Sequence, residues 1–150
     1  MPTFKNVKEL EKYLQKQITN SLKADVSKKS IELMKEHIEE DVYKAYTPYS
    51  TDDTTPHYER TYKLLNSNEA NMIDDNTLEL TNSRSDEESS RYIVPVIEYG
   101  KGYEWGYTRD LDKEIGERPF MKNTAKDLRD GKAKEFIAEA LKKRGLNVVE

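Results

Sequence analysis

The segment IEYGKGYEWGYTRDLDKEIGERPF, from Ile97 to Phe120, decides how the rest of the chain is arranged. It holds four of the chain's six glycines, interleaved with three tyrosines and the single tryptophan. Glycine permits sharp turns and close backbone approach, and aromatic side chains provide contact area at a low entropy cost. Because Pro119 followed by an aromatic residue is typical of a helix start, the segment predicts an extended run, an aromatic loop and a terminal helix.

The composition indicates a modest core and a large polar surface. Of the 150 residues, 35% are hydrophobic and 36% are charged, and the 10 tyrosines outnumber the three phenylalanines. Tyrosine suits half-buried surfaces such as protein interfaces better than a dry core. The length predicts a single domain covering residues 1–150.

Charge, cysteine content and hydropathy exclude several classes of protein. A net charge of −4 argues against nucleic-acid binding, including direct sequence-specific recognition. The absence of cysteine excludes disulfides, thiol nucleophiles and thiolate metal sites. No apolar run is long enough to span a membrane, and the N-terminus lacks a signal-peptide pattern. We therefore expect a soluble protein of the cytoplasm with no membrane partner.

The first third of the chain predicts a long helical region. Asn6 and Glu9 fit a capping box, with Phe4 as a candidate staple, and neither Pro nor Gly occurs between there and Pro48. The apolar stripe changes face near residues 25–30, where Asp25, Ser27 and Ser30 are candidate caps. This predicts two helices or one bent helix, the second from about Ser27 to Tyr46.

The middle of the chain predicts extended structure after a polar, turn-rich segment at residues 47–61. Residues 70–73 and 77–81 alternate apolar and polar side chains around an Asp-Asp-Asn turn, which predicts a hairpin. Arg91 to Tyr99 is a third extended run, and Pro95 places it at a sheet edge or partly outside the sheet.

The last element is a helix that starts at Pro119. A shift in its apolar face across Asp130-Gly131 predicts a bend at Gly131, and Gly145 is a suitable C′ residue. The order of elements predicts an α+β fold: N-terminal helices, a small mostly antiparallel β-sheet and a C-terminal helix packed on it.

No residue pattern argues positively for catalysis. GxSxG, P-loop and dinucleotide fingerprints are absent, and His37, Glu40 and Asp41 are best interpreted as a solvated helix face. We expect no catalytic residue, cofactor or metal. The alternative hypothesis is a small divalent-metal-dependent hydrolase or nuclease, whose candidate ligands are Asp52, Asp53, His57 and Glu98.

Charge is distributed unevenly along the chain. Residues 67–99 contain eight acidic and two basic residues, whereas residues 118–144 contain nine basic and four acidic ones. These two regions could face one another between identical subunits, and such a head-to-tail contact generates rings. Ordinary helix-surface lysines beside an acidic loop explain the pattern equally well. A further hypothesis for the function of the chain is a regulatory binding module whose acidic surface mimics nucleic acid.

Several short motifs occur together in a telling order. They are Pro48, the segment YERTYKLLNS at 58–67, VIEYG at 96–100 and RPFM at 118–121. In this order the chain, from about Ser27 to Gly145, resembles the tail-component, head–tail joining (neck or tail-completion) proteins of long-tailed bacteriophages. Tyr62 departs from that pattern, because the family usually has glycine at this position.

This resemblance implies a non-enzymatic virion protein, located at the neck or tail and made in the host cytoplasm. Such proteins form rings, often hexameric, and contact the head connector or stopper and the tail tube or tail terminator. Arg118 would be a salt-bridge donor and Phe120 a core or hinge anchor. The assembly residues that we predict are Arg60, Thr61, Tyr99, Gly100, Tyr103, Trp105, Tyr107, Arg118, Pro119 and Phe120.

Overall fold

The computed structural model describes residues 2–45, 61–87, 90–100 and 116–149. The described chain forms two compact units. Unit 1 consists of Met1–Glu32, Ala70–Thr81 and Asp127–Glu150, and unit 2 consists of Leu33–Glu69 and Asn82–Lys126. The fold belongs to the predicted α+β class, with helices and one two-stranded sheet among the described residues.

The N-terminal helix of unit 1 begins as its sequence predicts. Helix α1 spans Val7–Ser21, and the Asn6 side chain accepts a hydrogen bond from the Glu9 backbone N–H at 2.9 Å. The Glu9 carboxylate accepts from the Lys5 N–H rather than from that of Asn6. The Phe4 ring packs against the Tyr13 ring, with centroids 5.1 Å apart. The bond from Glu9 to Asn6 satisfies one of the backbone donors that a helix start leaves open.

The change of apolar face near residue 25 coincides with a change of helix type, and not with a break between two helices. A π-turn, η1 (Leu22–Val26), follows α1, and α2 (Ser27–His37) continues from it. None of the predicted caps starts a new helix, because the backbone stays helical and the Ser27 hydroxyl donates back to the Lys23 carbonyl at 2.6 Å. A π-turn adds a residue to one turn, which rotates the apolar stripe without breaking the helix.

The predicted hairpin is formed by β1 (Asn68–Asp74) and β2 (Thr77–Asn82). The Asp74 carboxylate accepts from the Asn76 N–H at 2.8 Å and from the Thr77 hydroxyl at 2.9 Å, so it closes the turn. These bonds lower the pKa of Asp74, the backbone bond from Asn76 most. Alternate side chains point inward, and those in unit 1 pack on a small core.

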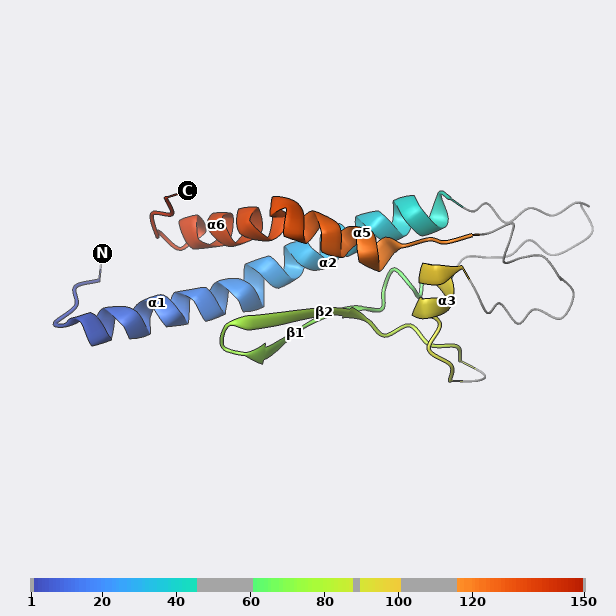
Figure 1. The fold of residues 1–150 in the computed structure, drawn as a ribbon. Helices are drawn as coiled ribbons and strands as arrows, with labels where there is room; N and C mark the ends of the chain where they lie inside the picture. The colour runs from blue at the N-terminus through green and yellow to red at the C-terminus, as the bar shows by residue number, and fades with distance from the viewer. Residues whose placement is uncertain (1, 46–60, 88–89, 101–115, 150) are drawn as a thin grey trace, which may run out of the picture. The chain divides into compact units, whose positions relative to one another are not determined.

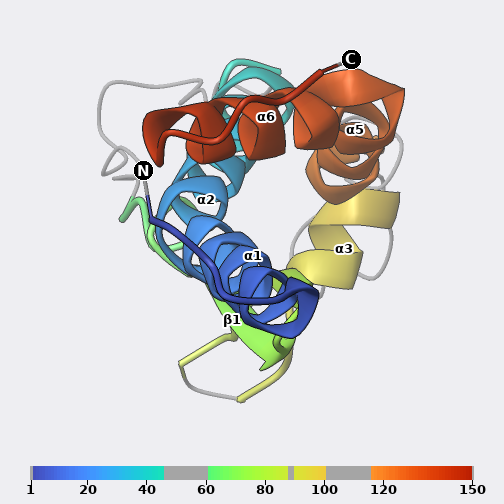
Figure 2. The ribbon, with the colours of Figure 1, turned by 90° about the vertical axis from the view of Figure 1, so that its left-hand side faces the viewer.

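Helix α6 (Ala133–Lys143) completes unit 1. Its residues Phe136, Ile137 and Ala140 meet Leu22 and Val26 of the π-turn, and the hairpin's inward side chains contact the same core. In Figures 1 and 2, α6 and the hairpin lie on different sides of α1. The π-turn is therefore the centre of this unit.

Gly131 and Gly145 act as predicted. The kink lies in η3 (Leu128–Lys132), where Gly131 has φ 135°, a conformation that favours glycine. Past the end of α6, Gly145 has φ 80°, and its N–H donates to the Lys142 carbonyl while that of Leu146 donates to Leu141. This pair of bonds is a Schellman cap.

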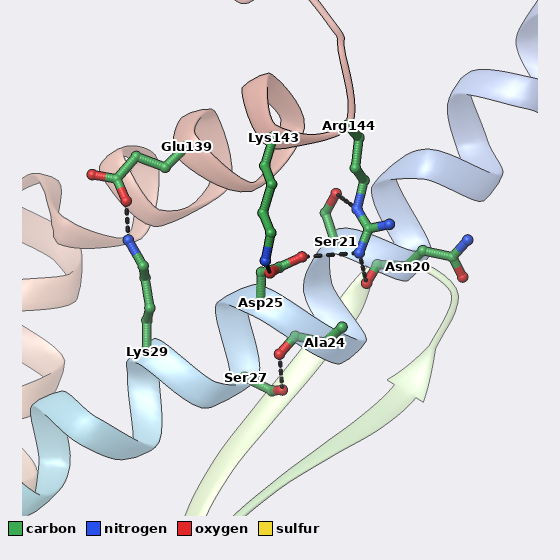
Figure 3. Close-up of polar contacts among 9 residues, drawn as sticks. All are labelled: Asn20, Ser21, Ala24, Asp25, Ser27, Lys29, Glu139, Lys143 and Arg144. Carbon is green, nitrogen blue, oxygen red and sulfur yellow. Dashed lines mark hydrogen bonds and ion pairs between the residues drawn. The ribbon is translucent and has the colours of Figure 1, made fainter.

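A polar cluster fixes the end of α6 to the π-turn (Figure 3). The Asp25 carboxylate accepts from Lys143 Nζ at 2.7 Å and from the Arg144 guanidinium at 2.9 Å. Arg144 also donates to the Ser21 hydroxyl and the Asn20 carbonyl. The hydrogen bond from Lys143, with the positive charges of both basic residues, lowers the pKa of Asp25. A second ion pair joins Lys29 of α2 to Glu139 of α6.

Unit 2 contains its own core. It is built by η2 (Ile38–Tyr43), α3 (Val94–Tyr99) and α5 (Phe120–Asp127) together with the turn at residues 63–66. Its buried apolar side chains are Leu33, Met34, Ile38, Val42, Leu64, Val94, Ile97 and Phe120. Phe120 and Ile38 are wholly buried.

The prediction of an extended run from Arg91 to Tyr99 is wrong. Only Tyr92 forms a β-bridge, to Ser85, and the chain then enters α3 at Val94. Pro95 lies in the first turn of this helix, where a backbone N–H has no partner within the helix and proline's fixed φ suits the backbone. Proline was therefore a helix-start signal here, and not a mark of a sheet edge.

None of the helices in the described ranges is long and apolar enough to cross a membrane.

Candidate protein-interaction site

The predicted contact segment starts and ends in unit 2, and the structure brings its two ends together. We call the described residues at these ends the segment base: Glu98, Tyr99, Gly100, Gly116, Arg118, Pro119 and Phe120. Tyr103, Trp105 and Tyr107, and likewise Arg60, lie outside the described residues. The candidate metal ligands Asp52, Asp53 and His57 also lie outside them.

Two glycines cross at the segment base. Gly100 ends α3 in the left-handed conformation, with φ 63°, and Gly116 has φ 66°. A Cβ atom on Gly100 would lie 2.3 Å from the carbonyl carbon and oxygen of Gly116 and 2.7 Å from the Glu117 nitrogen. No side chain fits at that separation, so the close approach requires glycine at position 100. A Cβ on Gly116 would meet nothing within 4 Å.

Hydrogen bonds tie the same two ends together. The buried Glu98 carboxylate accepts from the backbone N–H groups of Met121 and Lys122 at 3.0 and 2.9 Å, so it caps α5 from a helix more than 20 residues earlier. The Arg118 N–H donates to the Ile97 carbonyl at 3.1 Å. An acidic group at a helix N-terminus satisfies open donors and is favoured by the helix dipole.

The residues of the segment base divide into buried anchors and an exposed neighbour. Phe120 is wholly buried, and the Arg118 side chain is 8% exposed. Both pack inside unit 2, and Pro119 is half-buried. Tyr99 is 63% exposed. Among these residues, Tyr99 is the side chain that a partner protein can reach.

A ring pair joins the residues that flank the segment at 46–60. The rings of Tyr43 and Tyr62 meet edge to face with centroids 5.5 Å apart, and the Leu65 N–H donates to the Tyr43 hydroxyl at 3.3 Å. Thr61 and Tyr62 are exposed. Tyr62 has φ 55°, which an L side chain rarely adopts. Glycine adopts this backbone conformation without strain.

Asn82 organises this part of unit 2, a role that the sequence does not signal. Its buried side chain donates to the Leu64 carbonyl at 2.8 Å and to the Asn68 side chain at 2.7 Å, and accepts from the Arg84 N–H. The Tyr92 hydroxyl donates to the Asn82 carbonyl at 2.9 Å, and burial raises the pKa of Tyr92. A buried amide with all these partners fixes the turn at 63–66 against the end of β2.

In η2, Asp41 makes internal contacts, whereas Glu39 and Glu40 are exposed. The Asp41 carboxylate contacts His37 Nδ1 at 3.1 Å and accepts from the Asn123 amide at 2.9 Å. In residues 2–45, 61–87, 90–100 and 116–149, no three His, Asp or Glu side chains form a group that could hold a metal ion. Glu98, the one described member of the alternative metal set, has both carboxylate oxygens on the start of α5.

Comparison with known proteins places the chain in a family. The family model described as YomN matches residues 6–144. The chain is also 33% identical over 149 residues to the SPbeta prophage-derived uncharacterized protein YomN of Bacillus subtilis (strain 168), and the match covers 96% of each chain. No solved structure matches the chain. The two matches indicate a phage-derived protein. This chain belongs to the YomN family.

Proposed function

We propose that this chain is a structural virion protein that acts in phage head–tail joining or tail completion. It works as a ring subunit at the neck or tail end, and it acts through protein–protein contacts without catalysis. Its partners are further copies of itself, the head connector or stopper, and the tail tube or tail terminator.

Two lines of support concern its origin. The Bacillus subtilis relative of this chain is prophage-derived. The order of motifs in this chain resembles that of head–tail joining proteins. The residue within the motifs that departs from the pattern is Tyr62, which adopts the left-handed backbone conformation that favours the glycine of the pattern. The residue differs from the pattern, but the backbone supports the alignment. The segment at 100–118 is also longer and more aromatic than is usual in that family.

The observation that carries the proposal is the closed segment base. Crossing glycines, a cross-element helix cap and a buried phenylalanine hold the two ends of the Gly-aromatic segment together. A contact segment whose ends are fixed loses less conformational entropy on binding than one with free ends. Tyr, Trp and Gly in that segment suit a protein interface.

The proposal predicts that the chain is a constituent of the particle. Virions of a phage that encodes the chain would be purified, analysed by mass spectrometry, and labelled with antibody for electron microscopy. We expect the chain to be present at a fixed copy number and the label to lie at the head–tail junction or tail end. Particles that are intact and infectious but lack the chain would contradict the proposal.

A further inference from the structure

The outward side of the hairpin carries exposed acidic residues and an exposed isoleucine. Because Met72 and Leu78 point into the core of unit 1, Ile73 and Glu79 lie on the opposite face. Ile73 is 64% exposed. Residues 67–83 contain four acidic residues and no Lys or Arg. Asp75 lies in the turn between the two strands and is exposed as well. We call the group of Ile73, Asp75 and Glu79 the acidic face.

The acidic face is held in place by α1. The Thr19 hydroxyl donates to the Asp75 carbonyl at 2.8 Å, and the Gln15 amide donates to the Asn76 side chain. The Asp75 and Glu79 carboxylates have no ion-pair partner among the described residues. The exposed Asp75, Glu79 and Ile73 thus lie on a hairpin whose turn is hydrogen-bonded to α1.

A surface of the opposite charge lies on α6 of the same unit. Three of the five charged residues of this helix have partners: Glu135 with Lys132, Glu139 with Lys29, and Lys143 with Asp25. Lys134 and Lys142 are exposed and have no ion-pair partner in the described ranges. Half-buried Ala138 and Leu141 lie between them. We call these four residues the basic stripe.

Each of the two surfaces carries two like charges. Lys134 and Lys142 are two helical turns apart, about 12 Å. Asp75 lies in the turn and Glu79 in β2, so their backbones are at most about 13 Å apart. The acidic face also contains Ile73, and the basic stripe contains Ala138 and Leu141. Figures 1 and 2 show α6 and the hairpin on different sides of α1. Because α1 lies between them, the two surfaces of one copy do not face each other.

From this complementarity we infer that the acidic face of one copy binds the basic stripe of a second copy. The contact joins two different surfaces, so each copy keeps one of each free for the next, and repetition gives a ring when the rotation closes. This inference rests on the proposed function, and it names the contact that builds the ring.

Charge reversal tests the contact in the purified full-length chain. One variant carries Lys134→Glu and Lys142→Glu, and the other carries Asp75→Lys and Glu79→Lys. Sedimentation velocity would be run at millimolar concentration and low ionic strength, where attraction between surface charges is screened least. We expect concentration-dependent association of the wild type, and about a tenfold or greater loss in each variant.

Mixing the two variants gives the decisive result. Each keeps one native surface, and their two altered surfaces are complementary to each other, so the mixture should associate again.

The control variant, Lys8→Glu with Lys12→Glu, has the same net charge as the first variant and alters exposed residues of α1. It should associate like the wild type. Thermal unfolding of every variant checks that the fold is retained.

Three results would overturn the inference: a wild type that stays monomeric under these conditions, reversal variants that associate as the wild type does, or a mixture that fails to associate. None of these affects the virion analysis described above, which detects the chain in particles however its copies contact each other. A failure of the self-contact and a failure of the proposed function can therefore be distinguished.

Discussion

Gly100 and Gly116 cross so closely that a Cβ atom on Gly100 would lie 2.3 Å from the Gly116 carbonyl group. The contact joins the end of α3 to the residues that lead into α5. Both glycines have positive φ, yet only Gly100 lacks room for a side chain. This difference makes Gly116 a matched control for Gly100.

Gly100→Ala should destabilise the chain far more than Gly116→Ala. Each alanine meets the left-handed penalty of about 1–2 kcal/mol, and at position 100 a steric overlap adds about 1–3 kcal/mol. Urea unfolding of the two variants measures the difference. Equal losses would mean that the glycines do not cross as described.

Glu98→Ala should destabilise α5 by about 1–3 kcal/mol, because two backbone donors lose a buried acceptor. Glu98→Gln keeps one side-chain oxygen and should lose less. Amide hydrogen exchange at Met121 and Lys122 should speed up in the alanine variant. Unchanged exchange there would show that Glu98 does not cap the helix.

Tyr62→Gly should be more stable than Tyr62→Ala by about 1 kcal/mol, despite the greater freedom of glycine in the unfolded chain. Both variants lose the ring contact with Tyr43, so the comparison isolates the backbone conformation at position 62. Thermal unfolding measures both. A more stable alanine variant would contradict the positive φ.

Asp25→Asn should lower the stability of the chain at neutral pH, by about 1 kcal/mol for a charge-assisted surface contact. The folded-state pKa of Asp25 lies below its usual 3.8, so its contribution is complete above 3.8 and is lost as the pH falls through the folded-state value. Denaturation curves of the two proteins should therefore converge at acidic pH. A gap that stays constant down to the lowest pH would contradict the ion-pair assignment.

Trp105→Ala should leave the fold intact and impair particle assembly, because we predict that this side chain contacts a partner protein. Circular dichroism and thermal unfolding would check the fold, and plaque yield from a phage carrying the variant would check assembly. An unfolded variant would place Trp105 in the core instead.

Local signals predicted most of the helical fold. Asn6, Gly131 and Gly145 each occupy the cap or kink position that their chemistry predicts, and the Asp74 turn closes the expected hairpin. Such features depend on neighbouring residues, so a single sequence carries them. The α+β class followed from their order.

The errors arose where a local pattern has two meanings. Val94, Val96 and Ile97 are apolar and β-branched, which favours a strand. Pro95 also suits a first helical turn, and the chain forms a helix with Val94 and Ile97 buried. The π-turn at Leu22–Val26 shifts the apolar stripe just as a helix break would. The pairing of Glu98 with α5 and the role of Asn82 depend on residues distant in sequence, which spacing alone does not bring together.

The most direct test of the central claim is electron microscopy of lysates from a phage deleted for this gene. We predict filled heads and separate tails, with few joined particles, and recovery of joined, infectious particles when the wild-type gene is supplied on a plasmid. Joined, infectious particles at the normal yield from the deletion phage would contradict the account.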